Sequence, residues 1–150
     1  MRSALRSSAM VVLLLVLPAC SKDDGDTTPT ATTVTVALQE FAVLPAASSA
    51  PAGDVTFTAT NNGPDDQHEL LVVKTDLDPG MLPVDANGAV DEAGAGFEVI
   101  GEIEPFDVDT TESVTFPLTA GAYVLACNIY DEAENEAHYK LGMRTAFTVT

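Results

Sequence analysis

The sequence contains few basic residues, only two histidines and only two cysteines. Lysine and arginine together number 6, against 23 aspartates and glutamates, and the formal net charge is −17. Because phosphate binding needs a basic surface, this balance argues against a nucleic-acid partner. It suits a protein partner with a basic patch, since opposite charges steer an encounter, and it equally suits an acidic surface that serves only solubility or a salty habitat.

The sequence also lacks an apolar run long enough to cross a membrane. The apolar run at residues 10–19 has ten residues, whereas a spanning helix needs about 20. Two arginines and no acidic residue precede this run, so residues 1–19 are predicted to be a secretory signal peptide. We therefore expect an exported protein, in the cell envelope or periplasm or at the cell surface.

The residues that follow the apolar run predict a membrane tether. Residues 17–20 read LPAC and resemble a bacterial lipobox, in which the cysteine is lipidated and becomes the first mature residue. Cys20 would then anchor the protein to a membrane; the alternative is an ordinary cleaved signal with an incidental cysteine. Residues 20–32 are polar and rich in Thr and Asp, which predicts a disordered tether. Residues 33–150 remain for one small domain with its own core.

No stretch of the sequence has a strong helical period, and no internal repeat is visible. Several segments instead alternate apolar and polar residues, and turn sequences such as PAGD, NNGPDD and DANG separate them. This pattern predicts an all-β Greek-key β-sandwich or barrel. Two finer expectations are that Phe97, Val99 and Ile103 share a face, and that the insert at residues 131–137 forms a helical turn or two. The predicted strands lie at residues 33–38, 54–60, 68–74, 97–104, 112–118, 122–127 and 144–150.

Cys127 ends one of these strands and is expected to point inward. It shares a face with Tyr123 and Leu125 on strand geometry. A buried structural cysteine is one interpretation. In an exported protein whose other cysteine carries lipid, however, a lone thiol suits a metal or catalytic role.

Three further soft ligands accompany this cysteine. His68, Cys127, His138 and Met143 together offer two imidazoles, one thiolate and one thioether, which is the ligand set of a type 1 copper site. Zinc could use some of these ligands, but a thioether is a poor zinc ligand. A Cys–His hydrolase is the remaining enzymatic interpretation, and it leaves the methionine unexplained.

At these residues the chain resembles the cupredoxins, the small blue copper proteins, and in particular exported plastocyanin- or azurin-like members from bacteria. The family signature of Tyr-x-x-x-Cys, a loop, His, three residues, Gly-Met and a last strand is matched by Tyr123, Cys127, His138, Gly142 and Met143. The upstream ligand follows an Asn/Gly turn, as His68 does. The resemblance implies a Greek-key sandwich that binds one copper ion at one end and transfers single electrons without catalysis. It also implies that the exposed edge of His138 is the route for electrons.

Two features depart from the family pattern. Ten residues separate Cys127 from His138, which is longer than in familiar members. Glu69 follows the upstream histidine where the family often has Asn, whose backbone N–H donates to the cysteine sulfur; that donor would remain, while a carboxylate enters the surroundings of the site.

Other functions of the same fold remain open. A cupredoxin-fold binding or assembly module that no longer uses copper for electron transfer is one alternative, and a copper-handling protein is another. The second needs a His- or Met-rich cluster, yet Met81 is the only other methionine of the domain and is interpreted as loop packing. A second, His-rich copper centre is excluded because both histidines are already used. The insert carries four carboxylates, which either form a solvated loop or face a cationic redox partner: Asp131, Glu132, Glu134 and Glu136.

Overall fold

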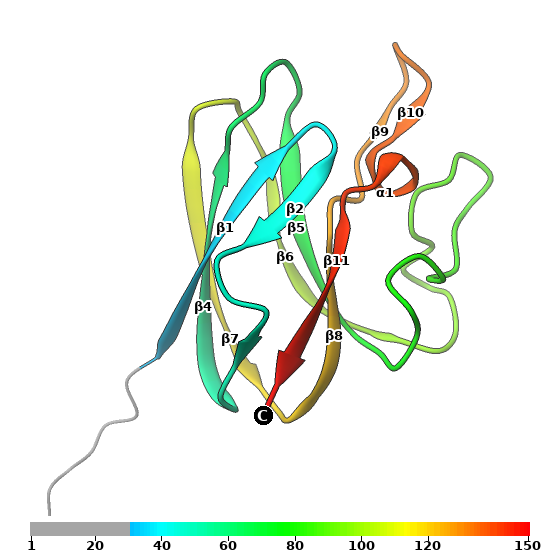
Figure 1. Ribbon diagram of the computed structural model, residues 1–150. Helices are drawn as coiled ribbons and strands as arrows, with labels where there is room; N and C mark the ends of the chain where they lie inside the picture. The colour runs from blue at the N-terminus through cyan, green and yellow to red at the C-terminus, as the bar shows by residue number, and fades with distance from the viewer. Residues whose placement is uncertain (1–30) are drawn as a thin grey trace, which may run out of the picture.

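The computed structural model describes residues 31–150 as two β-sheets packed face to face (Figure 1). The predicted signal peptide and most of the predicted tether lie outside the described residues. The first strand begins at Thr32. The four-stranded sheet has the order β2-β1-β4-β7, formed by β2 (Ala42–Pro45), β1 (Thr32–Gln39), β4 (Gly53–Asn61) and β7 (Thr111–Leu118).

The second sheet carries the strands that lead to the predicted ligands. It has five strands in the order β3-β11-β8-β5-β6, formed by β3 (Ser49–Ala50), β11 (Arg144–Val149), β8 (Gly121–Ala126), β5 (His68–Lys74) and β6 (Glu98–Phe106). The chain crosses between the sheets after β2, β3, β4, β6 and β7, and β1 runs parallel to β4. These crossovers confirm the predicted all-β Greek-key sandwich.

Alternating side chains fill the space between the sheets. Val34, Val36 and Leu38 of β1 are 3 % exposed or less. On β8, Tyr123 and Leu125 face this main core together with Cys127, whereas Val124 and Ala126 pack on the opposite face of the sheet. The predicted inward direction of Cys127 is therefore confirmed, because side chains two residues apart in a strand share a face.

The alternation predicted for β6 is wrong beyond Val99. Gly101 pairs with Val72 and Val99 pairs with Val73, so Ile100 has no partner and forms a β-bulge. A bulge reverses which face the following residues occupy. Ile103 consequently joins the main core, while Phe97 and Val99 pack on the outer face. Gly101 has φ +153°, and a Cβ there would lie 2.6 Å from the Phe116 ring.

A long connection, which we name the cover segment (residues 75–97), packs over the outer face of the five-stranded sheet. It joins β5 to β6 and forms only an isolated bridge between Val84 and Val90. Figure 1 draws it as the green loops beside α1 and β8. Its buried residues Leu82 and Val90 form a second core with side chains from β5, β8 and α1, namely Leu71, Val73, Val124, Ala126 and Tyr139.

The insert between Cys127 and His138 forms a hairpin, not the expected helical turns. We name residues 130–137 the acidic hairpin; it contains β9 (Tyr130–Asp131) and β10 (Glu136–Ala137). Asp131 Oδ1 accepts the N–H groups of Ala133 and Glu134 at 2.6 and 3.1 Å, and such side-chain contacts favour a turn over a helix. The helical turn comes next, as α1 (His138–Leu141). No helix in residues 31–150 is long and apolar enough to span a membrane.

Candidate metal centre

Three separate segments deliver the predicted ligands to one end of the sandwich. His68 begins β5, Cys127 follows β8, and His138 begins α1. Because β5 and β8 are antiparallel neighbours, with Leu71 opposite Ala126, the start of one lies beside the end of the other. The N–H of His138 donates to the carbonyl of Ile129 at 3.0 Å, which brings α1 back to the end of β8.

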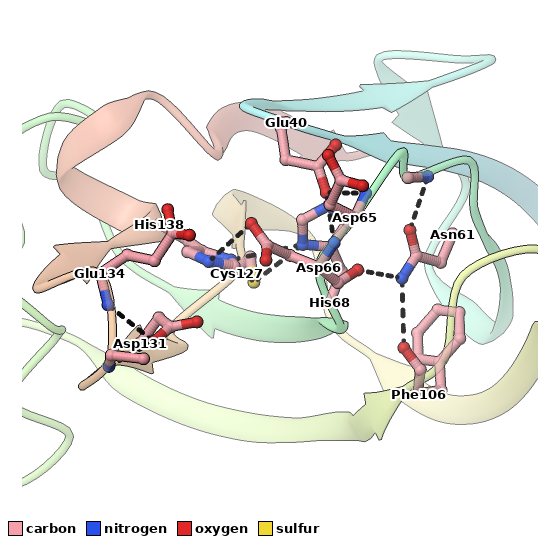
Figure 2. Close-up of polar contacts among 12 residues, drawn as sticks. Glu40, Asn61, Asp65, Asp66, His68, Phe106, Cys127, Asp131, Glu134 and His138 are labelled. Atoms are coloured by element: carbon pink, nitrogen blue, oxygen red, sulfur yellow. Dashed lines mark hydrogen bonds and ion pairs between the residues drawn. The ribbon is translucent and has the colours of Figure 1, made fainter.

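The side chains of His68, Cys127 and His138 converge (Figure 2), with their ligand atoms within 4.8 Å of one another. The two Nδ1 atoms are 3.3 Å apart, and Cys127 Sγ lies 3.4 Å from Nδ1 of His138 and 4.0 Å from Nδ1 of His68. Metal bonds of about 2.0 Å to nitrogen and about 2.3 Å to sulfur can span these separations from a single point. The three residues are at most 1 % exposed. The donor set therefore fits one metal ion.

Met143 is buried beside this group. Its N–H donates to the carbonyl of His138 at 3.0 Å, and its carbonyl accepts the N–H of Cys127 at 3.0 Å. Its side chain is 0 % exposed and belongs to the main core, as Cys127 does. The backbone thus ties the fourth predicted residue to two of the other three.

Burial governs the protonation of the cysteine. It raises the pKa of the Cys127 thiol to about 12, although the backbone N–H groups of Glu69 and Ile129 donate to the sulfur and lower that pKa. The donor from Glu69 is the one that the family resemblance implies. The metal-free site holds a neutral thiol at pH 7, so metal binding must displace its proton.

The outer nitrogen of each histidine faces a carboxylate (Figure 2). His68 Nε2 lies 3.5 Å from Glu40 Oε1, and His138 Nε2 lies 3.9 Å from Asp66 Oδ2. Burial lowers the pKa of both imidazoles, which keeps them in the neutral form that binds metals. A carboxylate beside Nε2 favours a proton on that nitrogen, and that tautomer leaves the lone pair of Nδ1 available to a metal.

Glu40 and Asn61 also fix the turn that precedes His68. Glu40 Oε1 accepts the N–H groups of Asp65 and Asp66 at 3.2 and 2.8 Å. The amide of Asn61 donates to the carbonyls of Asp66 and Phe106 at 2.8 and 3.2 Å. Sequence reasoning missed Glu40 and Asp66, although two acidic residues just before His68 are a signal visible in the sequence.

Glu69 points away from the three ligands, to the outer side of the sheet. Its Oε1 accepts the backbone N–H of Asn128 at 2.7 Å. Burial raises the pKa of Glu69 to about 7; the carboxylates of Glu102 and Glu92 add to that rise, and the Asn128 N–H opposes it. The carboxylate thus links the residues that follow His68 and Cys127.

The edge of His138 is not exposed as the resemblance implies. The residue is only 1 % exposed, because Phe41 packs edge-on against its ring at 5.3 Å and Asp66 lies over Nε2. The physical reason is the packing of two segments distant in the sequence, the turn after β1 and the turn before β5, onto the ring. His138 instead borders an open cavity of about 470 Å³ lined by Asp65, Asp66, Gln67, Pro105, Ile129, Tyr130, Asp131 and Glu132.

The four predicted carboxylates of the acidic hairpin divide between two depressions near the site. Asp131 and Glu132 line the cavity beside His138. Glu134 and Glu136 line a second depression together with Glu40.

The predicted packing of Met81 in its loop is wrong, because its side chain is 69 % exposed. The buried neighbour Leu82 holds that part of the cover segment instead.

Comparison with known proteins identifies the fold. A reduced auracyanin from Roseiflexus castenholzii is 24 % identical with a TM-score of 0.55, over 80 % of this chain and 98 % of that one. Auracyanin A, a "blue" copper protein from Chloroflexus aurantiacus, is 20 % identical with a TM-score of 0.52, over 81 % of this chain and 100 % of its own. An azurin from Methylomonas sp. strain J is 16 % identical with a TM-score of 0.53, over 81 % and 99 %.

Sequence comparison adds no relative. No protein-family model matches the chain, and no curated protein matches it. The structural matches and the strand order agree with the prediction made from the ligand pattern. The chain has the cupredoxin fold, the fold of the auracyanins and azurins, and it gathers His68, Cys127 and His138 at one end.

Proposed function

We propose that the protein is a type 1 copper protein that carries single electrons between redox partners. The convergence of Nδ1 of His68, Nδ1 of His138 and Sγ of Cys127 supports this most directly. Met143 is the proposed fourth ligand, because its backbone is hydrogen-bonded to both His138 and Cys127. A copper ion held there supplies one-electron redox chemistry, to which a thiolate, two imidazoles and a weak thioether are suited.

The chain's own residues would keep this site rigid and dry. The three ligands are closed off from solvent, and the carboxylates of Glu40 and Asp66 lie beside the outer nitrogens of the two rings. The N–H groups of Glu69 and Ile129 stabilise negative charge on the sulfur. A fixed ligand set suits an electron carrier better than an enzyme, since little has to move when the charge changes.

Reconstitution with Cu(II) tests this proposal. We expect an intense visible charge-transfer band from the thiolate, with one copper bound per chain. Cys127→Ser removes the thiolate and should abolish the band. If the wild type gives no band and binds Cu(II) no more tightly than Cys127→Ser, the carrier proposal is wrong, and a binding or assembly module is the remaining interpretation.

We propose that the redox partner carries a basic patch and docks beside His138. Residues 31–150 contain 20 acidic and 3 basic side chains, a net charge of −17. The carboxylates of the acidic hairpin border the cavity and the depression next to the ring. The second-order rate constant with a cationic redox protein should fall as ionic strength rises, and neutralising the four hairpin carboxylates should weaken that dependence. A salt dependence equal to that of the wild type would contradict the docking site.

We further propose export and a lipid anchor at Cys20, on the sequence of residues 1–20 alone. Expression of the full chain in a bacterium should place the protein in the membrane fraction, with labelled fatty acid attached. Cys20→Ser should release it into the soluble envelope fraction. Equal fractionation of both forms would refute the anchor.

A further inference from the structure

Three of the four proposed ligands, His68, Cys127 and His138, are each followed by a residue on the opposite side of the five-stranded sheet. Those residues are Glu69, Asn128 and Tyr139. Asn128 has the strand parity of Val124 and Ala126, which line the second core, and Tyr139 belongs to that core itself. Two of the three reach across to the cover segment.

Asn128 binds the middle of the cover segment. Its Oδ1 accepts the N–H of Val90, and its Nδ2 donates to the carbonyl of Val90 and to Glu92 Oε1, both at 3.1 Å. The backbone N–H of Asn128 donates to Glu69. The residue next to Cys127 is therefore held both by β5 and by the cover segment.

Tyr139 binds the first part of the same segment. Its hydroxyl donates to the carbonyl of Pro79 at 2.6 Å and accepts the N–H of Leu82 at 3.1 Å. The side chain is 1 % exposed, and its ring packs in the second core with Leu82 and Val90. The residue next to His138 is thus fixed by the segment that also fixes the residue next to Cys127.

These contacts stabilise the long loop between Cys127 and His138. Ten residues separate Cys127 from His138, and the short hairpin between them rests on two residue pairs, Glu136 with Asp131 and Ala137 with Tyr130. A two-stranded ribbon of this size is weak in isolation. Backbone bonds of His138 with Ile129 and of Met143 with Cys127 and His138 also connect the two ends of the loop. The cover segment adds a further connection from the far side of the sheet.

We propose that the cover segment is a clamp that sets the distance between Cys127 and His138 through Asn128 and Tyr139. Both are positioning residues, since they hold the segment and their preceding neighbours bind the metal. Coupling between two sites is reciprocal, so metal binding should in turn stabilise the cover segment. The metal part of this inference rests on the proposed function.

The test compares two buried tyrosines that each lose only a hydroxyl. Tyr139→Phe removes the contacts with Pro79 and Leu82. Tyr123→Phe is the matched control, because Tyr123 is 2 % exposed and its hydroxyl donates to the carbonyl of Thr119 at 2.7 Å, outside the cover segment. In metal-free full-length protein, Tyr139→Phe should speed amide hydrogen exchange in residues 78–92 and 138–143 more than the control does. Equal exchange in the two variants would overturn the clamp without any metal being present.

Copper affinity and the visible spectrum form the second arm. Tyr139→Phe and Asn128→Ala should each weaken Cu(II) binding by about tenfold, the scale for residues that support metal ligands, and should shift the charge-transfer band. Tyr123→Phe should keep the wild-type affinity and band even where it lowers the melting temperature. Wild-type affinity and band in both positioning variants would overturn the inference, whereas failure of the wild type to outbind Cys127→Ser would refute the proposed copper function instead.

Discussion

The buried carboxylate of Glu69 should make the metal-free protein less stable as the pH rises, and Glu69→Gln should remove that loss. Burial raises the pKa of Glu69 from 4.5 to about 7 in the folded chain. A carboxyl with a raised pKa in the folded state favours folding in its protonated form. The wild type therefore keeps this stability below about pH 4.5 and loses it progressively between pH 4.5 and 7.

The size of the effect follows from the same values. The interval from 4.5 to about 7, at 1.36 kcal/mol per pH unit, corresponds to a loss of about 3 kcal/mol. Glutamine is neutral at every pH, and its carbonyl oxygen can still accept the Asn128 N–H that Glu69 binds at 2.7 Å. The stability of Glu69→Gln relative to the wild type should thus rise with pH and level off above about pH 7.

Urea denaturation of the metal-free full chain between pH 4.5 and 8 measures this difference. The difference in free energy of unfolding between the variant and the wild type at each pH cancels the contribution of the histidines, which both chains share. Glu112→Gln is the control, because Glu112 is an exposed residue of β7. Its stability relative to the wild type should not rise in this way. A pH-independent difference between wild type and Glu69→Gln would refute the assigned burial of this charge.

Three further predictions concern the site and the core. Neutralising the four acidic-hairpin carboxylates to Gln or Asn should raise the copper reduction potential by tens of millivolts at low salt. Each charge about 10 Å away in a water-like dielectric contributes roughly 20 mV. A potential that cyclic voltammetry finds unchanged would show that these charges do not influence the site. Glu40→Ala leaves the N–H groups of Asp65 and Asp66 without their acceptor and should lower the free energy of unfolding by about 1–3 kcal/mol, whereas Glu40→Gln keeps an acceptor and should lose less, so equal losses would count against the contact. Phe57→Ala, at a position 0 % exposed and packed edge-on against Phe147, should cost about 3–5 kcal/mol in urea denaturation, and a loss below about 1 kcal/mol would mean that the core closes over the gap.

Strand alternation and ligand order were readable in the sequence because they are local or chemically distinctive. The inward direction of Cys127 follows from its spacing to Tyr123 and Leu125, and the geometry confirms it. Two histidines, one cysteine and one methionine are rare enough here that their order alone predicted a common site. The structure brings His68, Cys127 and His138 together as that order predicts.

What sequence reasoning missed depends on contacts between distant segments. The bulge at Ile100 arises from pairing with β5, which no local period reveals. Glu40 lies 28 positions before His68, and only the packing of the two sheets places it at Nε2. The burial of His138 likewise depends on Phe41 and on the turn before β5, whereas the insert's composition alone suggested a helical turn.

The parallel pairing of β1 with β4 fixes where the domain is joined to whatever precedes it. Thr32 lies opposite Val55 near the start of β4, while the end of β4 at Asn61 leads through the turn to His68. The polypeptide therefore enters the sandwich at the pole opposite the ligands, as Figure 1 shows. An electrode linker, affinity tag or natural anchor attached ahead of Thr32 would hold the molecule by its far pole and leave the ligand-bearing pole turned outward, accessible to a second molecule arriving from solution.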